Sequence, residues 1–182
     1  MFEITELFRN ELRKTSNEEL IKLAELSNMQ QYLDLSIYKE KGITEYPKKE
    51  VMVALIVELG ELMNEFPTKF KYWKDTAKDN YQKGLVEYVD CLHFALSLTN
   101  YMTSEDIESY TDEKYIESIT YSNITNRKYD LSDILVQIID IEELCLPYLM
   151  MLGKKLGFSW DEIYKTYIEK NRINYERLNS GY

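Results

Sequence analysis

Four acidic residues stand in two apolar segments at a spacing that places them on shared helix faces. Glu58 and Glu61 are three residues apart in "VELGELMNE", and Glu87 and Asp90 are three residues apart in "EYVDCLHF". Residues at this spacing lie on the same face of a helix, about one turn from each other. Charge buried in apolar surroundings must be paired or bound to a metal. We therefore expect two neighbouring antiparallel helices whose carboxylates hold Mg²⁺, or Mn²⁺ as a substitute, because these hard cations prefer oxygen ligands.

Two other interpretations of these carboxylates compete with a magnesium site. An E-x-x-E pair taken alone is typical of a solvated helix face. The second pair, however, lies in "LVEYVDCLHFALSL", which is apolar nearly all round, and such a pattern is typical of a buried helix. A di-iron bundle needs a Glu-x-x-His motif on each of two helices. The chain has one histidine, His93, so the residues favour a site made of carboxylates.

The composition limits the class of protein and of partner. With 182 residues, of which 45% are hydrophobic, the chain is expected to form a single domain, 1–182. Its net charge of −10 argues against a nucleic acid or an anionic membrane as partner. No secretory leader and no apolar run of about 18 residues is visible, so we expect a cytoplasmic protein. Cys91 and Cys145 lie in apolar segments and are expected to be buried, reduced thiols.

The pattern of apolar residues predicts an all-α protein, a helical bundle. Glycine and proline are scarce, and the apolar period is that of helices. Ser16-x-x-Glu19 and Ser159-x-x-Glu162 read as capping boxes, and Pro147 is expected to kink a long helix. A short helix could follow Thr103, and residues 109–130 form a polar excursion. The main helices are expected over 17–41, 47–65, 80–102, 130–155 and 159–178.

Cationic and aromatic residues outside the carboxylate segments could bind a nucleotide. Lys170 and Arg177 are seven apart, share a helix face and could donate charge-assisted hydrogen bonds to phosphate. The alternative is a solvated cation pair that complements the helix dipole. Trp73, next to Lys71 and Lys74 in "FKYWK", is either a core residue or a pocket wall on which a base can stack.

Five blocks spread from Met29 to Tyr182 carry a family resemblance. The chain resembles the all-α NTP pyrophosphatases, the MazG-like superfamily, and within it the dimeric dUTPases. The blocks are "MQQYLD", "VELGELMNE", "FKYWK", "EYVDCLHF" and "YIEKNRINYERLNSGY". Asp34 and Leu178 depart from the pattern, since family members often carry Asn and Gln at these two positions. The resemblance implies a homodimer that hydrolyses dUTP, and dUDP as well, to dUMP with Mg²⁺ ions, and so supplies dUMP for thymidylate synthesis.

The resemblance also implies roles for individual residues. Glu58, Glu61, Glu87 and Asp90 are the expected metal ligands, and Glu58 or Glu61 the general base that takes a proton from the attacking water. The Gln30 amide is expected to match the donor–acceptor edge of uracil. Phe94 is expected to press against the deoxyribose and leave no room for a 2′-hydroxyl. The remaining substrate-binding residues expected are Lys71, Trp73, His93, Lys170, Asn171, Asn174 and Arg177.

Two further functions remain open at this point. One is a MazG-like pyrophosphohydrolase that accepts a broader range of nucleoside triphosphates. The other is a non-catalytic helical binding module whose 109–130 excursion contacts a protein partner. The presence of all four carboxylates argues against the binding module, because a protein without catalytic activity has no need to keep them.

Overall fold

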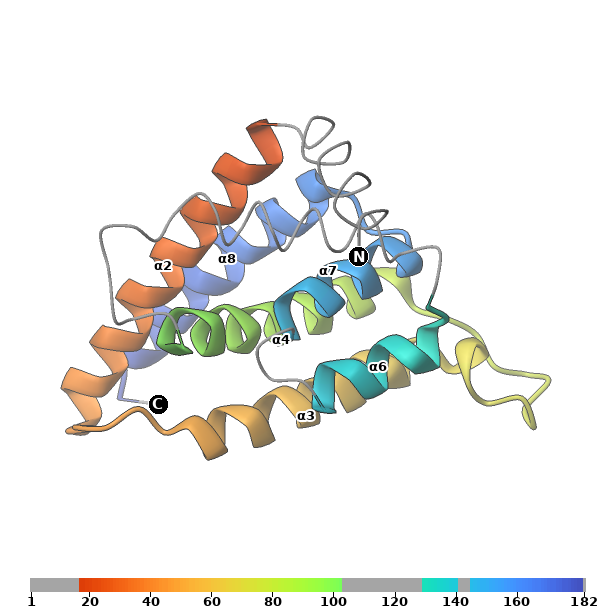
Figure 1. Cartoon of the computed structure of the whole chain (residues 1–182), viewed down its shortest axis with the longest axis horizontal. Coiled ribbons are helices and arrows are strands. Elements are labelled where there is room, and N and C mark those ends of the chain that lie inside the picture. Colours follow the sequence, from red (N-terminus) through yellow and green to blue (C-terminus); the bar gives the residue numbers. More distant parts are fainter. Residues whose placement is uncertain (1–16, 103–128, 141–144, 182) are drawn as a thin grey trace, which may run out of the picture.

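The computed structural model describes residues 17–102, 129–140 and 145–181, and every element in these ranges is helical. The predicted all-α class is therefore confirmed for this part of the chain. Figure 1 shows the arrangement of the helices. In chain order the elements are α2 (Asn17–Lys41), α3 (Lys48–Glu65), the 3-10 helix η1 (Pro67–Lys69), α4 (Tyr81–Met102), α6 (Leu131–Asp140), α7 (Cys145–Leu156) and α8 (Trp160–Asn179).

The first three long helices begin and end within one residue of their predicted bounds. Pro47 is the N-cap of α3, where its missing N–H is not needed, and α3 ends at the predicted Phe66–Pro67 break. The Ser16 cap, the helix after Thr103 and most of the 109–130 excursion lie outside the described residues.

The prediction of one long helix over 130–155, kinked at Pro147, is wrong. The structure has two helices there, because α6 ends at Asp140 and α7 begins at Cys145. Pro147 is the third residue of α7. The N–H groups of a first helical turn have no acceptor within the helix, so a proline at this position breaks no hydrogen bond.

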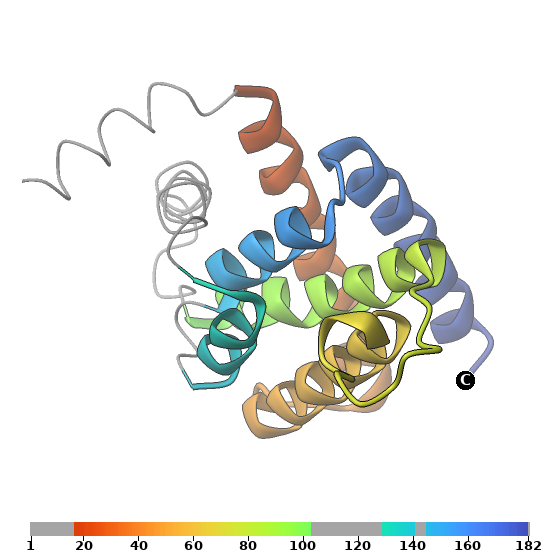
Figure 2. The same ribbon diagram turned by 90° about the vertical axis from the view of Figure 1, so that its right-hand side faces the viewer.

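Helix α4 is the centre of the described structure. It packs against α2, α3, α7 and α8, and Figure 2 shows these helices arranged around it. Its central part is buried almost all round, as the sequence predicts, and the buried residues include Tyr88, Val89, Cys91, Leu92, Ala95, Leu96 and Leu98. Cys145 of α7 is buried as well, so both cysteines lie in the interior. None of the described helices is long and apolar enough to cross a membrane.

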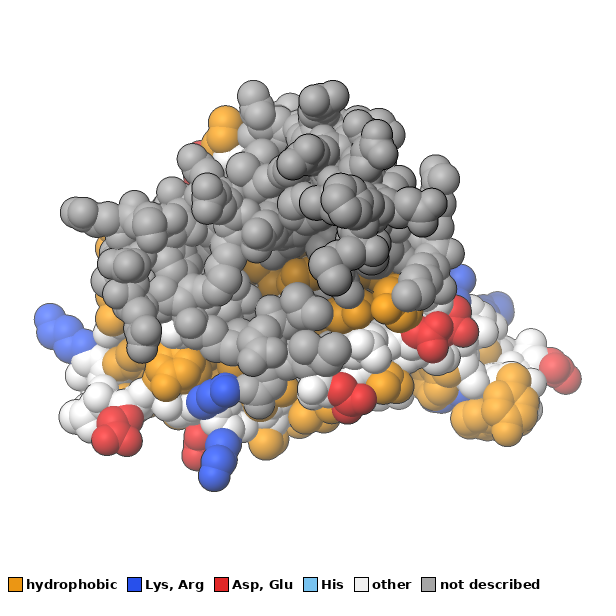
Figure 3. Space-filling model, in the orientation of Figure 1, with side chains coloured by type: hydrophobic (Ala, Val, Ile, Leu, Met, Phe, Trp, Pro, Cys, Tyr) orange, Lys and Arg blue, Asp and Glu red, His pale blue; other side chains and the backbone are white. Residues whose placement is uncertain are grey.

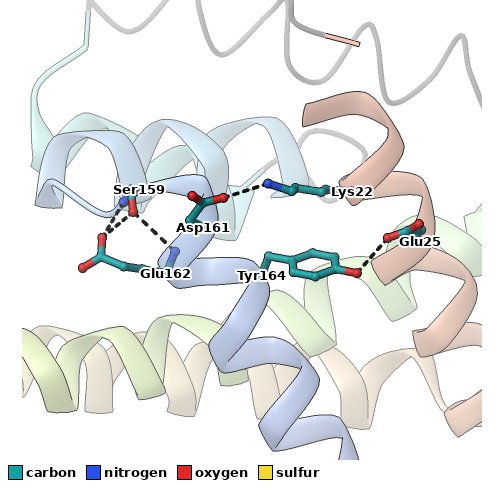
Figure 4. Close-up of polar contacts among 6 residues, drawn as sticks. All are labelled: Lys22, Glu25, Ser159, Asp161, Glu162 and Tyr164. Atoms are coloured by element: carbon teal, nitrogen blue, oxygen red, sulfur yellow. Dashed lines mark hydrogen bonds and ion pairs between the residues drawn. The ribbon is translucent and has the colours of Figure 1, made fainter. Parts of the chain in front are cut away.

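Helix α8 is fixed at its start by its cap and by α2 (Figure 4). The predicted capping box is present: the Ser159 hydroxyl accepts from the Glu162 backbone N–H, and the Glu162 carboxylate accepts from Ser159. Lys22 of α2 forms a 2.7 Å ion pair with Asp161, and the Tyr164 hydroxyl donates to Glu25 at 2.8 Å. These contacts set the direction in which α8 runs past α4.

Candidate functional site

Three of the four predicted metal ligands come together between α3 and α4. The two helices run in opposite directions and lie side by side (Figures 1 and 2). One carboxylate oxygen each of Glu58, Glu61 and Glu87 lies within 4.8 Å of the other two. The E-x-x-E stripe of α3 therefore faces the acidic stripe of α4, which is the convergence that the spacing predicts.

The electrostatics of this cluster fit a divalent cation. Glu58 and Glu87 are half-buried, whereas Glu61 is exposed. Burial, followed by the negative charges of Asp90, Glu61 and Glu87, raises the pKa of Glu58 to about 7. Burial and then the charges of Asp90 and Glu61 also raise the pKa of Glu87. Like charges held this close repel one another, and a hard cation that accepts oxygen ligands relieves that repulsion.

Asp90, the fourth predicted ligand, lies beside the cluster and already has a counterion. Its carboxylate forms a 2.6 Å ion pair with Lys170 of α8, and both side chains are only 18% exposed. Burial raises the pKa of Asp90, while Lys170 and then Arg177 act in the opposite direction. The structure thus brings α8 to the acidic face through Lys170, one of the predicted phosphate-binding residues.

A cavity of about 410 Å³ opens between α2, α4 and α8. This volume lies in the range of small-molecule sites. Leu33 and Ile37 of α2 and Val51 of α3 supply part of its apolar wall. Five of the predicted substrate-binding residues line it, namely Gln30, His93, Phe94, Asn174 and Arg177. The sequence did not single out Asp34 for the site, or Ser97, and both also line the cavity.

A buried polar network connects α2, α4 and α8 at the wall of this cavity. Gln30 Oε1 lies 2.6 Å from His93 Nδ1 and accepts a 2.8 Å hydrogen bond from the Tyr167 hydroxyl. Gln30 Nε2 donates to Asp34 at 2.8 Å. The His93 ring stacks on Tyr167 with centroids 4.0 Å apart. Burial lowers the pKa of His93 to about 3, so its imidazole is neutral.

Sequence reasoning missed Tyr167 as a member of this network. The one available signal is its position four residues before Asn171, which places both side chains on the same face of α8. Asp34 was noticed only as a departure from the family pattern. Its position four residues after Gln30 puts it within hydrogen-bond reach on the same helix.

The other predicted substrate-binding residues lie away from the cavity wall. Trp73, in the segment between η1 and α4, is 65% exposed and makes edge contacts with the rings of Phe70 and Tyr72. Lys71 lies with its ammonium 5.2 Å from the centre of the Phe70 ring. Asn171 is buried, and its Nδ2 has no hydrogen-bond partner.

The sequence of the chain was compared with protein-family models and with curated protein sequences. The family model described as dUTPase matches residues 22–182, a range that includes every predicted metal-ligating and substrate-binding residue. No curated protein sequence gives a significant match.

Proposed function

Because the chain belongs to the all-α dUTPase family, and is thus a dUTP diphosphatase, we propose that it converts dUTP, and dUDP as well, to dUMP with Mg²⁺. The metal ligands in this proposal are Glu58, Glu61, Glu87 and Asp90. The nucleoside occupies the cavity lined by Gln30, His93, Phe94, Asn174 and Arg177. A product of this reaction, dUMP, is the substrate for thymidylate synthesis.

The observation that supports the proposal best is the position of the acidic cluster next to the cavity. Glu87 and Asp90 lie on α4, and His93 and Phe94 follow about one helical turn after Asp90. Arg177 lines the cavity and acts electrostatically on Asp90. A nucleotide with its base in the cavity therefore has its phosphates directed toward the carboxylates, with the cations of α8 alongside.

The residues of the chain divide the chemical work in this proposal. Bound Mg²⁺ supplies Lewis-acid stabilisation of the charge that develops on the phosphate oxygens. Glu58 or Glu61 takes the proton of the attacking water. Lys170 and Arg177 donate charge-assisted hydrogen bonds to phosphate oxygens. Lys170 has to give up its ion pair with Asp90 in order to bind the substrate in this way. Phe94, half-buried in the cavity wall, packs against the deoxyribose and excludes a 2′-hydroxyl.

Pyrophosphate release from dUTP tests the proposed function. We expect release with Mg²⁺ and loss of release with a chelator, because the phosphates cannot approach an acidic cluster without cations. The same assay with dCTP and dTTP measures base selectivity. Equal rates with all three nucleotides would assign the chain to the broader class of pyrophosphohydrolases, and no release from any of them would refute the enzymatic proposal.

We also propose that the chain is a homodimer. In support, large apolar side chains of the outer face of α3 are exposed, namely Val53, Ile56 and Val57, and α6 exposes Val136 and Ile139. Hydrophobic side chains reach the surface along the lower edge of the view in Figure 3. Apolar side chains grouped on one face are typical of protein–protein contacts.

Sedimentation velocity tests the oligomeric state. We expect the wild type to sediment as a dimer and Val57→Lys as a monomer, because a charge in an apolar interface loses its hydration without gaining a partner. Ile21→Lys, an equally exposed apolar position on α2, is the matched control and should leave the dimer intact. A monomeric wild type would refute the homodimer, and a dimeric Val57→Lys variant would place the interface elsewhere.

A further inference from the structure

The hydrogen-bonding capacity of Gln30 is almost fully used inside the protein. Its side chain is buried, with 4% of its surface exposed. An amide oxygen has two lone pairs, and those of Gln30 meet His93 Nδ1 and the Tyr167 hydroxyl. One of the two N–H groups of Nε2 donates to Asp34. What remains for a ligand is one N–H donor, so Gln30 alone cannot match a donor and an acceptor of a base at once.

The Asp34 carboxylate determines the orientation of the Gln30 amide, with Nε2 toward Asp34 and Oε1 toward His93. An ionised carboxylate accepts hydrogen bonds and cannot donate them. Asp34 accepts from Gln30 and also from Ser97. Burial raises the pKa of Asp34 to about 6, which leaves the group ionised at neutral pH and above. If the amide were turned over, its oxygen would face the carboxylate and both groups would lack a donor.

This orientation fixes the proton on His93 in turn. Because Gln30 presents its oxygen to His93, Nδ1 has to carry the hydrogen of the neutral ring. His93 Nε2 is then the unprotonated nitrogen. The structure gives Nε2 no hydrogen-bond partner, and the ring is buried by its stacking on Tyr167 and by its place in α4. The tautomer of His93 is thus linked, through the Gln30 amide, to Asp34 on another helix.

We propose that Asp34 is a positioning residue for base recognition: its carboxylate holds the Gln30 amide in one orientation, keeps His93 in the Nδ1-protonated tautomer, and leaves an N–H of Gln30 for a carbonyl oxygen of the base. The Asp34 carboxylate itself lines the cavity beside Gln30 and supplies the acceptor that Gln30 lacks. Together the two residues offer a donor and an acceptor to a base edge with a carbonyl next to an N–H. The identity of the ligand as a uracil nucleotide rests on the proposed function, whereas the orientation of the network does not.

Nitrogen NMR of histidine tests the network directly, because the chain has one histidine and its signals need no assignment. In ligand-free protein labelled with ¹⁵N-histidine, at mildly alkaline pH, long-range proton–nitrogen spectra distinguish a protonated from an unprotonated ring nitrogen. We expect Nδ1 to be the protonated nitrogen in the wild type. A wild-type protein with the proton on Nε2 would overturn the proposal.

Asp34→Asn tests whether Asp34 sets this state. The amide of an asparagine can donate or accept, so both orientations of Gln30 become available, and we expect the single-tautomer pattern to be lost. Glu40→Gln, an exposed position on the same helix, is the matched control and should keep the wild-type spectrum. An unchanged spectrum of a folded Asp34→Asn protein would show that Asp34 does not set the tautomer and would overturn the proposal.

Kinetics supply the second measurement on the same variants. Asp34→Asn is expected to raise KM for dUTP about tenfold with little change in kcat, because a charge-assisted hydrogen bond near the base is lost while the carboxylate cluster is untouched. An altered tautomer with unchanged KM would overturn the role in base recognition. A wild type with the expected tautomer but no activity on dUTP would refute the proposed function and leave the network assignment standing.

Discussion

Replacing Glu61 by Gln is expected to reduce dUTP hydrolysis by more than about 100-fold. Substitutions of groups that only support a metal ligand already cost up to about 100-fold in affinity or activity, so loss of a ligand charge should cost more. Gln has the shape of Glu, and Glu61 is exposed, so the fold has no reason to change. Removing one of three mutually repelling charges should leave the metal-free protein at least as stable as the wild type. Pyrophosphate release and thermal unfolding, each with Mg²⁺ and with a chelator, measure the two effects.

Glu50→Gln is the matched control for this experiment. It makes the same chemical change in the first turn of the same helix, away from the cluster, and should retain wild-type activity. Mg²⁺ should raise the unfolding temperature of the wild type and of Glu50→Gln by more than that of Glu61→Gln. Activity of the Glu61→Gln protein within about twofold of the wild type would remove Glu61 from the metal site.

Replacing Gly84 by Ala is expected to lower the free energy of unfolding by about 1–3 kcal/mol, the usual cost of overpacking. Gly84 lies in the first turn of α4 against the ring of Phe66, and a Cβ at this position would stand 2.2 Å from Phe66 Cε2 and 2.7 Å from Cζ. Phe66 is itself buried and contacts the ring of Phe158, so the ring has little space to retreat. Helices α3 and α4 would have to move apart, which would also disturb the carboxylates that they share.

Gly60→Ala provides the comparison, because no atom lies within 4 Å of the Cβ that this change would add. Gly60 lies on the α3 face proposed for the homodimer, so both glycine exchanges are compared in the Val57→Lys background, in which that face is expected to be exposed. There Gly60→Ala should stabilise the protein by up to about 1 kcal/mol, since alanine has the higher helix propensity. Urea unfolding of the two variants and of their Val57→Lys parent measures the difference. A Gly84→Ala protein as stable as this parent would mean that the contact between α4 and Phe66 is looser than the structure indicates.

The sequence predicted the elements whose signals are local. The period of apolar residues, Pro47 and the Ser159 box set the bounds of α3 and α8 almost to the residue, because caps and breaks depend on neighbouring residues only. The approach of Glu58, Glu61 and Glu87 followed from the same period, since a short connection between two helices leaves few ways to pack two acidic stripes.

Features that depend on contacts between distant segments could not be predicted in this way. The apolar pattern continues across residues 141–144, so it could not separate α6 from α7. The use of both lone pairs of Gln30 depends on Tyr167, which is 137 residues away in the chain. The pairing of Asp90 with Lys170 likewise depends on how α8 crosses α4. The exposure of Trp73 reflects the path of a connecting segment, for which apolar periodicity carries no information.

Helix α4 carries two of the proposed metal ligands, Glu87 and Asp90, and two residues that line the cavity, His93 and Phe94. Asp90 and His93 are three residues apart, which corresponds to about 4.5 Å along the helix axis. A base that binds one turn further along the helix axis shifts its own phosphates by a similar distance. A shift of that size moves the phosphates away from the carboxylates. If the function proposed above holds, a wrong base that binds is therefore expected to be rejected at the cleavage step.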